Sequence, residues 1–195
     1  AQGYSVGATL SPHMHRYNER VRLNGEEATD AQLIEAFSAV DKGRRDIPLT
    51  YYEYSVLAAF WLFRQAELDA CVLEVGLGGR LDVTNIVDAE VAVVTSIGLD
   101  HQNFLGDTLE DIGAEKAAVC RAGAPLLLGG KMPESVTQLA EGRGAPMHRF
   151  GTDFWCQRTS TDWTVRLVDR AGPVSAVLPR VALRNAALAT AAVSQ

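Results

Sequence analysis

Short apolar runs alternate with stretches of helical periodicity along most of the chain. Two of these runs, at 70–75 and 91–97, are continuously apolar, which is typical of strands in a parallel sheet that is covered on both faces. Between and after them, apolar residues recur at helical spacing, with capping signals, in 29–40, 49–66 and 108–121. This alternation predicts an α/β fold: an open, mostly parallel sheet with helices on both faces.

The pattern changes in the last quarter of the chain. Between Met147 and Leu178 polar and apolar residues alternate, which predicts antiparallel hairpins. An Ala-rich stretch that reads as a helix follows this region. We therefore expect one α/β domain with a small antiparallel portion at about 145–180.

Composition narrows the class of protein. With 195 residues, 47% hydrophobic and 22% charged, the chain has the size and content of one globular domain. Its net charge of −6, with no run of Lys or Arg, argues against a nucleic-acid-binding surface. Three cysteines without C-x-x-C spacing indicate reduced thiols, and no apolar stretch is long enough to span a membrane. We expect a cytoplasmic protein that binds neither nucleic acid nor membrane.

Polar side chains follow three of the predicted strands. Ser11 follows the stretch at 4–10, which reads as the first strand, Glu74 lies at the end of the apolar run that begins at 70, and His101 follows the run at 91–97. Ligands of open parallel sheets bind beyond the carboxyl ends of the strands, so we expect these groups to converge on one edge. Each residue alone is more simply explained as a turn or loop residue, and only their shared edge favours a site.

A glycine-rich loop follows Glu74. Gly76, Gly78 and Gly79 begin like a dinucleotide-binding fingerprint, but the sixth position is Leu81 and the following "DVTN" reads as a loop. A pyrophosphate would then have no helix N-terminus to bind, so we reject that interpretation. The glycines instead allow a ligand or a neighbouring stretch of backbone to come close.

Lys116 falls on an apolar helical stripe together with Ile112, Val119 and Cys120. One interpretation is that its stem packs on the core while the ammonium group reaches water. The other is a partly buried amine whose pKa is lowered by desolvation. Such an amine can react with CO₂ to form a carbamate, whose oxygens suit a hard ion such as Mg²⁺.

Several long segments resemble one known family. They include "SPHMHRYNERVRLNGE", "LTYYEY", "LEVGLGGRLDVTN", "VTSIGLDHQNFLGDTLEDIGAEKA" and "LRNAALATAA". They are similar, in order and nearly end to end, to bacterial dihydrofolate synthase/folylpolyglutamate synthase, a family of Mur-ligase-like amide ligases. The resemblance implies that ATP phosphorylates the carboxylate of dihydropteroate or a folate, and that L-glutamate attacks the acyl phosphate. It also implies Mg²⁺, because catalysis of phosphoryl transfer depends on neutralising charge and aligning the γ-phosphate.

The resemblance assigns roles to the residues already noted. Ser11 and Glu74 match ligands of the Mg²⁺ shared with ATP, whereas Glu74 and His101 match ligands of a second Mg²⁺. Lys116 matches a lysine that is carbamylated in the family and helps to hold the second ion. The remaining matches are Tyr52, Asp82 and Val83 at the pteroate site and Asn185 near the adenine. The alternative for Glu74 is a loop-capping role in which it pairs with Arg80.

Two parts of the family pattern are not found. No G-x-x-x-x-G-K-[ST] phosphate loop occurs in the 195 residues, and no C-terminal glutamate-ligase domain follows the Ala-rich helix. We therefore interpret 1–195 as part of the ATP-binding, central domain, inactive alone, of an enzyme that is monomeric when intact. The alternatives are a Mur-type ligase of peptidoglycan precursors and a non-catalytic nucleotide-binding fragment.

Overall fold

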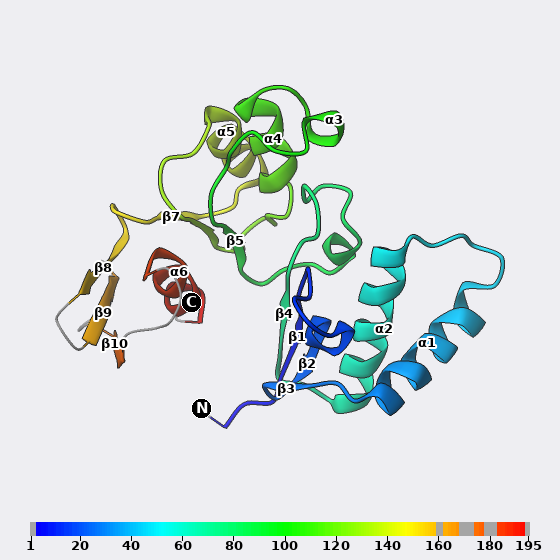
Figure 1. The fold of residues 1–195 in the computed structure, drawn as a ribbon. Coiled ribbons are helices and arrows are strands. Elements are labelled where there is room, and N and C mark those ends of the chain that lie inside the picture. Colours follow the sequence, from blue (N-terminus) through cyan, green and yellow to red (C-terminus); the bar gives the residue numbers. More distant parts are fainter. Residues whose placement is uncertain (1–2, 159–161, 168–173, 178–182, 194–195) are drawn as a thin grey trace. The chain divides into compact units, whose positions relative to one another are not determined.

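The computed structural model describes residues 3–158, 162–167, 174–177 and 183–193 (Figure 1). Its internal contacts divide the chain into two compact units, which are described separately. Unit 1 comprises Ala1–Leu77 and Leu81–Ile86, and unit 2 comprises Gly78–Arg80 and Val87–Gln195. The glycine-rich loop therefore contributes residues to both units.

Unit 1 contains a mixed four-stranded sheet in the order β3-β2-β1-β4. β1 (Val6–Thr9) pairs parallel with β4 (Ala70–Leu73) and antiparallel with β2 (Val21–Leu23), and β2 pairs with β3 (Glu26–Glu27). The pattern analysis did not predict β2 and β3, because strands of three and two residues are too short to show periodicity. The missed signal was Asn24-Gly25, whose positive φ values of 54° and 88° form a tight hairpin turn.

Two helices cover one face of this sheet. α1 (Asp30–Arg44) and α2 (Tyr51–Ala66) begin at the predicted capping boxes, where Thr29 pairs with Gln32 and Thr50 with Glu53. Each box satisfies backbone N–H groups that have no partner inside the helix. The helices pack against each other and the sheet through a core of Val21, Ala28, Leu33, Ala36, Val40, Ala58, Ala59, Leu62 and Phe63.

The prediction that the strand at 70–75 is buried on both faces is wrong for unit 1 as described. Ala70 and Cys71 in β4 are exposed, and Val72 is 54% exposed. The reason is that β4 is the edge strand of its sheet, and α1 and α2 pack on one face only.

Unit 2 contains a parallel sheet with helices on both faces. β5 (Ala92–Val94), β6 (Leu126–Leu128) and β7 (Met147–Arg149) pair in that order. Leu126 and Leu128 face a core built with α4 (Leu109–Ala117) and α5 (Glu134–Arg143), whereas Leu127 faces α6 (Leu183–Val193). Successive side chains of a strand point to opposite faces, so a continuous apolar run serves both cores.

The antiparallel portion is confirmed, with one correction. β8 (Phe154–Arg158), β9 (Asp162–Leu167) and β10 (Val174–Val177) form an antiparallel sheet in the order β10-β9-β8. The segment at Met147, however, forms β7, which pairs parallel with β6 because it follows α5 as the crossover return strand. The parts of the predicted region at 159–161, 168–173 and 178–180 lie outside the described residues.

The predicted α/β class, with a parallel sheet and a small antiparallel part, is thus confirmed. Three short helices complete the described chain: the 3₁₀ helices η1 (Tyr17–Arg20) and η2 (Val83–Ile86), and α3 (Gln102–Leu105). Among the residues that the structure describes, none of the helices has both the length and the apolar content to cross a membrane.

Candidate functional site

Ser11 and Glu74 lie together in unit 1. Both follow parallel strands that are neighbours in the sheet, and the Glu74 N–H donates to the Thr9 carbonyl at 3.0 Å. The Ser11 N–H in turn donates to the Glu74 carboxylate at 2.5 Å. Glu74 is exposed and Ser11 is half-buried. A carboxylate and a hydroxyl at one strand end are hard oxygen donors, which is the ligand chemistry that Mg²⁺ prefers.

Tyr52 connects helix α2 to this strand end. Its hydroxyl lies 3.0 Å from the Glu74 carbonyl oxygen, to which it donates, and 3.3 Å from an oxygen of Asp82. Burial, followed by the nearby Asp82 charge, raises the pKa of Tyr52. The phenol therefore stays protonated and acts as a donor that ties the helix to the strand end.

Asp82 holds the loop around it through both carboxylate oxygens. One oxygen accepts from the N–H groups of Gly76 at 3.0 Å and Leu77 at 3.2 Å. The other accepts from the backbone N–H of Thr84 at 2.9 Å and from its hydroxyl at 2.7 Å. These bonds fix the start of η2, where Val83 lies half-buried. Thr84 was missed by the sequence analysis, although an Asp followed two residues later by Thr is a turn signal.

The glycines after Glu74 are packed against protein groups. A Cβ atom added to Gly76 would lie 2.5 Å from the Tyr52 ring, and one added to Gly79 would lie 2.8 Å from the Glu115 carbonyl oxygen. Such distances are too short for any side chain. The predicted close approach of neighbouring backbone is confirmed at Gly79, whereas Gly76 is packed against a side chain, the Tyr52 ring.

His101 lies in unit 2, just before the short helix α3. Its φ is 51°, in the left-handed region that few residues other than glycine adopt. The side chain is exposed, and its Nε2 atom lies 3.7 Å from a carboxylate oxygen of Asp100. The imidazole is therefore accessible to a ligand and close to a negative charge.

Lys116 lies in the last turn of α4. Ile112 and Cys120, its neighbours on the predicted stripe, are fully buried, while Lys116 itself is half-buried. No ion pair or hydrogen bond of its amine is found within the described parts of the chain. The predicted position on an apolar stripe is confirmed.

Gly79 and Arg80 pack against the same turn of α4 that carries Lys116. The Arg80 N–H donates to the Glu115 carbonyl at 3.0 Å, and the Arg80 side chain forms an ion pair with the Glu115 carboxylate at 2.7 Å. Arg80 therefore has a carboxylate partner within its own unit.

The predicted site residues thus fall into two groups. Unit 1 brings Ser11, Glu74, Tyr52, Asp82 and Val83 to one end of its sheet. Unit 2 contains His101, Lys116 and Asn185. Asn185 is exposed on α6, which packs on the opposite sheet face from α4. Among the described residues, no three His, Cys, Asp or Glu side chains gather as a metal-binding cluster.

A pocket of about 320 Å³ lies elsewhere in unit 1, between the end of α1, the loop after it and α2. Its lining is largely apolar and includes Ile47, Leu57 and Trp61. None of the predicted site residues lines it, so it is separate from the candidate site.

Solved structures that resemble this chain indicate the class of protein to which its fold belongs. No family model matches the chain. Solved structures of similar fold include "E.coli FolC in complex with DHPP and ADP", with a TM-score of 0.92 and 46% identity over 98% of this chain and 46% of that one. Another is "bifunctional folylpolyglutamate synthase/dihydrofolate synthase with Mn, AMPPNP and L-Glutamate bound", with a TM-score of 0.88 and 43% identity over 98% of this chain and 47% of that one. The fold is therefore that of the Mur-ligase-like amide ligases.

The particular family follows from sequence. The chain is 47% identical over 194 residues to the "Dihydrofolate synthase/folylpolyglutamate synthase" of Escherichia coli (strain K12), which covers 98% of this chain. The chain is a homologue of these bacterial enzymes along almost its whole length, and the predicted resemblance is confirmed. It spans 46% of the length of that relative, which is about half.

Proposed function

We propose that the chain is part of an ATP-dependent ligase that forms an amide between L-glutamate and dihydropteroate or a folate. The identity of 47% over 194 residues with the Escherichia coli enzyme is the observation that carries this proposal. In it, residues 1–195 make up part of the ATP-binding, central domain of a cytoplasmic enzyme that acts as a monomer. Its partners are small molecules, because the net charge of −6 disfavours a nucleic acid.

Divalent ions are assigned to two groups of residues. Ser11 and Glu74 hold the ion shared with ATP, and Glu74 with His101 holds a second ion. Lys116, as a carbamate, supplies an oxygen to the second ion. The oxygen donors at Ser11 and Glu74, and the unpaired, half-buried amine of Lys116, support this assignment. Bound Mg²⁺ neutralises charge on the transferring phosphoryl group, which lowers the barrier to forming the acyl phosphate.

The remaining residues are assigned to binding. Tyr52, Asp82 and Val83 form the pteroate site, with Asp82 holding the loop that carries Val83. Asn185 lies near the adenine of ATP, and its exposure on α6 is consistent with a contact to ligand. L-Glutamate then attacks the activated carboxylate.

A chimera tests this proposal, in which the 195 residues replace the matched segment of the Escherichia coli relative. The chimera should sustain repeated release of ADP only when Mg²⁺, dihydropteroate and L-glutamate are all present. Glu74→Gln should lower the rate by more than about 100-fold, since even outer-shell changes at metal sites cost 10–100-fold. Lys116→Ala should also lower the rate, with partial recovery on adding a short-chain carboxylic acid that replaces the carbamate.

Three results would contradict the proposal. A folded chimera that adds amino acids to a peptidoglycan precursor but not to dihydropteroate would favour a Mur-type ligase. A folded chimera that binds ATP without any turnover would favour a non-catalytic fragment. Full activity of Lys116→Ala without additives would exclude the carbamate.

A further inference from the structure

Arg20 lies in an unusual environment for a cation in unit 1. Its guanidinium carbon lies 5.8 Å from the ring centre of Tyr17 and 5.3 Å from that of Tyr51. Its Nε–H donates to Nδ1 of His13 at 2.8 Å. An imidazole nitrogen that accepts a hydrogen bond brings no negative charge to the guanidinium. The side chain is thus held on three sides by aromatic rings.

Within the described part of the chain, no carboxylate forms an ion pair with Arg20. Among the residues that the structure describes, Arg20 forms no ion pair, and its two terminal nitrogens have no hydrogen-bond partner. Nearby acids are engaged elsewhere: Glu19 accepts from backbone N–H groups, and Asp30 lies 3.6 Å from Arg16 and accepts from Asn18. A half-buried guanidinium without a counter-ion can offer its two end nitrogens to a bidentate acceptor.

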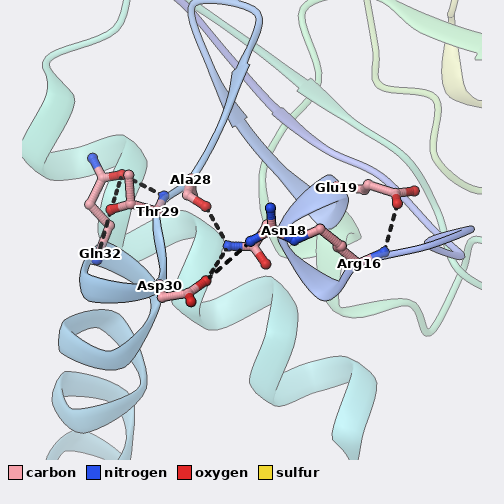
Figure 2. A network of polar contacts seen from close by, with 7 residues as sticks. All are labelled: Arg16, Asn18, Glu19, Ala28, Thr29, Asp30 and Gln32. Atoms are coloured by element: carbon pink, nitrogen blue, oxygen red, sulfur yellow. Dashed lines mark hydrogen bonds and ion pairs between the residues drawn. The ribbon is translucent and has the colours of Figure 1, made fainter.

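The segment that carries Arg20 is firmly held. The Glu19 carboxylate accepts from the N–H groups of Met14, His15 and Arg16 at 2.7–2.8 Å. Asn18, the residue before Glu19, donates to the Ala28 carbonyl and to Asp30 at the start of α1 (Figure 2). A donor fixed in advance loses less conformational freedom when a ligand binds.

Arg20 also lies at the same sheet end as the candidate metal ligands of unit 1. The Leu10 N–H donates to the Arg20 carbonyl at 2.9 Å, and Leu10 immediately precedes Ser11. Tyr51, one of the two flanking rings, is next to Tyr52 at the start of α2. The segment that carries the unpaired cation is therefore next, within unit 1, to residues assigned to metal and pteroate.

We propose that Arg20 is a substrate-binding residue that receives a carboxylate of the acid substrate, with Tyr17, Tyr51 and His13 fixing its orientation. This inference rests on the proposed function for the identity of the acid. The carboxylate is either the reacting benzoate group of dihydropteroate or the terminal α-carboxylate of a folate. The end nitrogens bind either group in the same bidentate manner.

A binding experiment on the 195-residue chain tests the site without requiring turnover. NMR titration with p-aminobenzoate should shift signals of the Arg20 segment, whereas p-aminobenzamide, the neutral amide, should shift them far less. Arg20→Gln should remove the preference for the acid, and Arg20→Lys should retain part of it. Arg22→Gln is the matched control, because Arg22 is paired with Glu27 at 3.2 Å and its loss should leave the preference unchanged.

Kinetics of the chimera then identify the carboxylate. Arg20→Gln should raise KM about 10- to 100-fold, as expected for a charged bidentate bond, with a smaller change in kcat. If KM rises for dihydropteroate, the benzoate group is the carboxylate that Arg20 binds. If KM rises only for a folate, Arg20 binds the α-carboxylate. An unchanged KM for both substrates, or no preference of the wild-type chain for p-aminobenzoate, would overturn the inference. If the chain prefers the acid through Arg20 while the wild-type chimera makes no amide, only the proposed function fails.

Discussion

In unit 1 the candidate site residues are held by hydrogen bonds, whereas in unit 2 they are held by close packing of the backbone. Glu74 and Asp82 are connected through Tyr52, and Asp82 accepts from four further donors around it. Lys116, in contrast, is carried by a helix turn against which Gly79 and Arg80 pack.

This difference indicates which amino-acid substitutions each unit tolerates. A hydrogen-bonded network depends on side-chain chemistry, so removing one hydroxyl weakens it while leaving the shape of the chain intact. A close backbone contact depends on shape, so adding one methyl group displaces both partners. The three predictions below test this contrast, beginning with the largest effect.

The largest effect is expected from Gly79→Ala. The new Cβ would lie 2.8 Å from the Glu115 carbonyl and 3.1 Å from that of Lys116, so the helix turn or the loop has to move. We expect a loss of about 1–3 kcal/mol in the free energy of unfolding, measured by urea denaturation.

Gly142→Ala is the matched control for this substitution. Gly142 lies in α5 of the same unit, and an added Cβ would have no heavy atom within 4 Å. Alanine favours a helix over glycine, so we expect a gain of up to about 1 kcal/mol. Equal effects of the two substitutions would show that unit 2 does not depend on this backbone contact.

A smaller effect is expected from Tyr52→Phe. It removes the hydroxyl that joins α2 to Glu74 and Asp82, which should cost about 0.5–1.5 kcal/mol of unfolding free energy. Tyr54→Phe on the same helix removes a bond to the Phe37 carbonyl and should cost a similar amount. In the chimera, Tyr52→Phe alone should raise the Mg²⁺ concentration required for activity. If Tyr52→Phe and Tyr54→Phe required the same Mg²⁺ concentration for activity, the hydrogen bonds of Tyr52 would not position Glu74.

The smallest effect concerns acid stability in unit 1. Backbone N–H groups, that of Met14 first, lower the pKa of Glu19 to about 2. The ionised carboxylate therefore contributes stability that is complete above its unfolded pKa of about 4.3 and is lost as the pH falls towards 2. Glu19→Gln should flatten the dependence of unfolding free energy on pH between about 5 and 2. An unchanged slope would show that these bonds do not persist in solution.

The sequence by itself determined the elements that local chemistry controls. The capping boxes at Thr29 and Thr50 placed the starts of α1 and α2, and the apolar run at 91–97 predicted β5. Glu74 was identified as a candidate because a carboxylate at the end of an apolar run is uncommon. The resemblance to folate ligases needed only the order and content of long segments, and the comparisons confirmed it.

Only the tertiary structure decided which groups meet. No periodicity in the sequence connects the residues that meet in the fold. Examples are the pairing of Arg80 with Glu115, the contacts of Gly76 and Gly79, and the side chains around the unpaired Arg20. The parallel pairing of β7 likewise depends on where α5 returns the chain, not on the local alternation. Sequence patterns report what each segment buries, because burial follows from side-chain polarity at fixed spacing. Partners across the fold depend on how the chain turns between segments, and that geometry is set by packing of the whole unit.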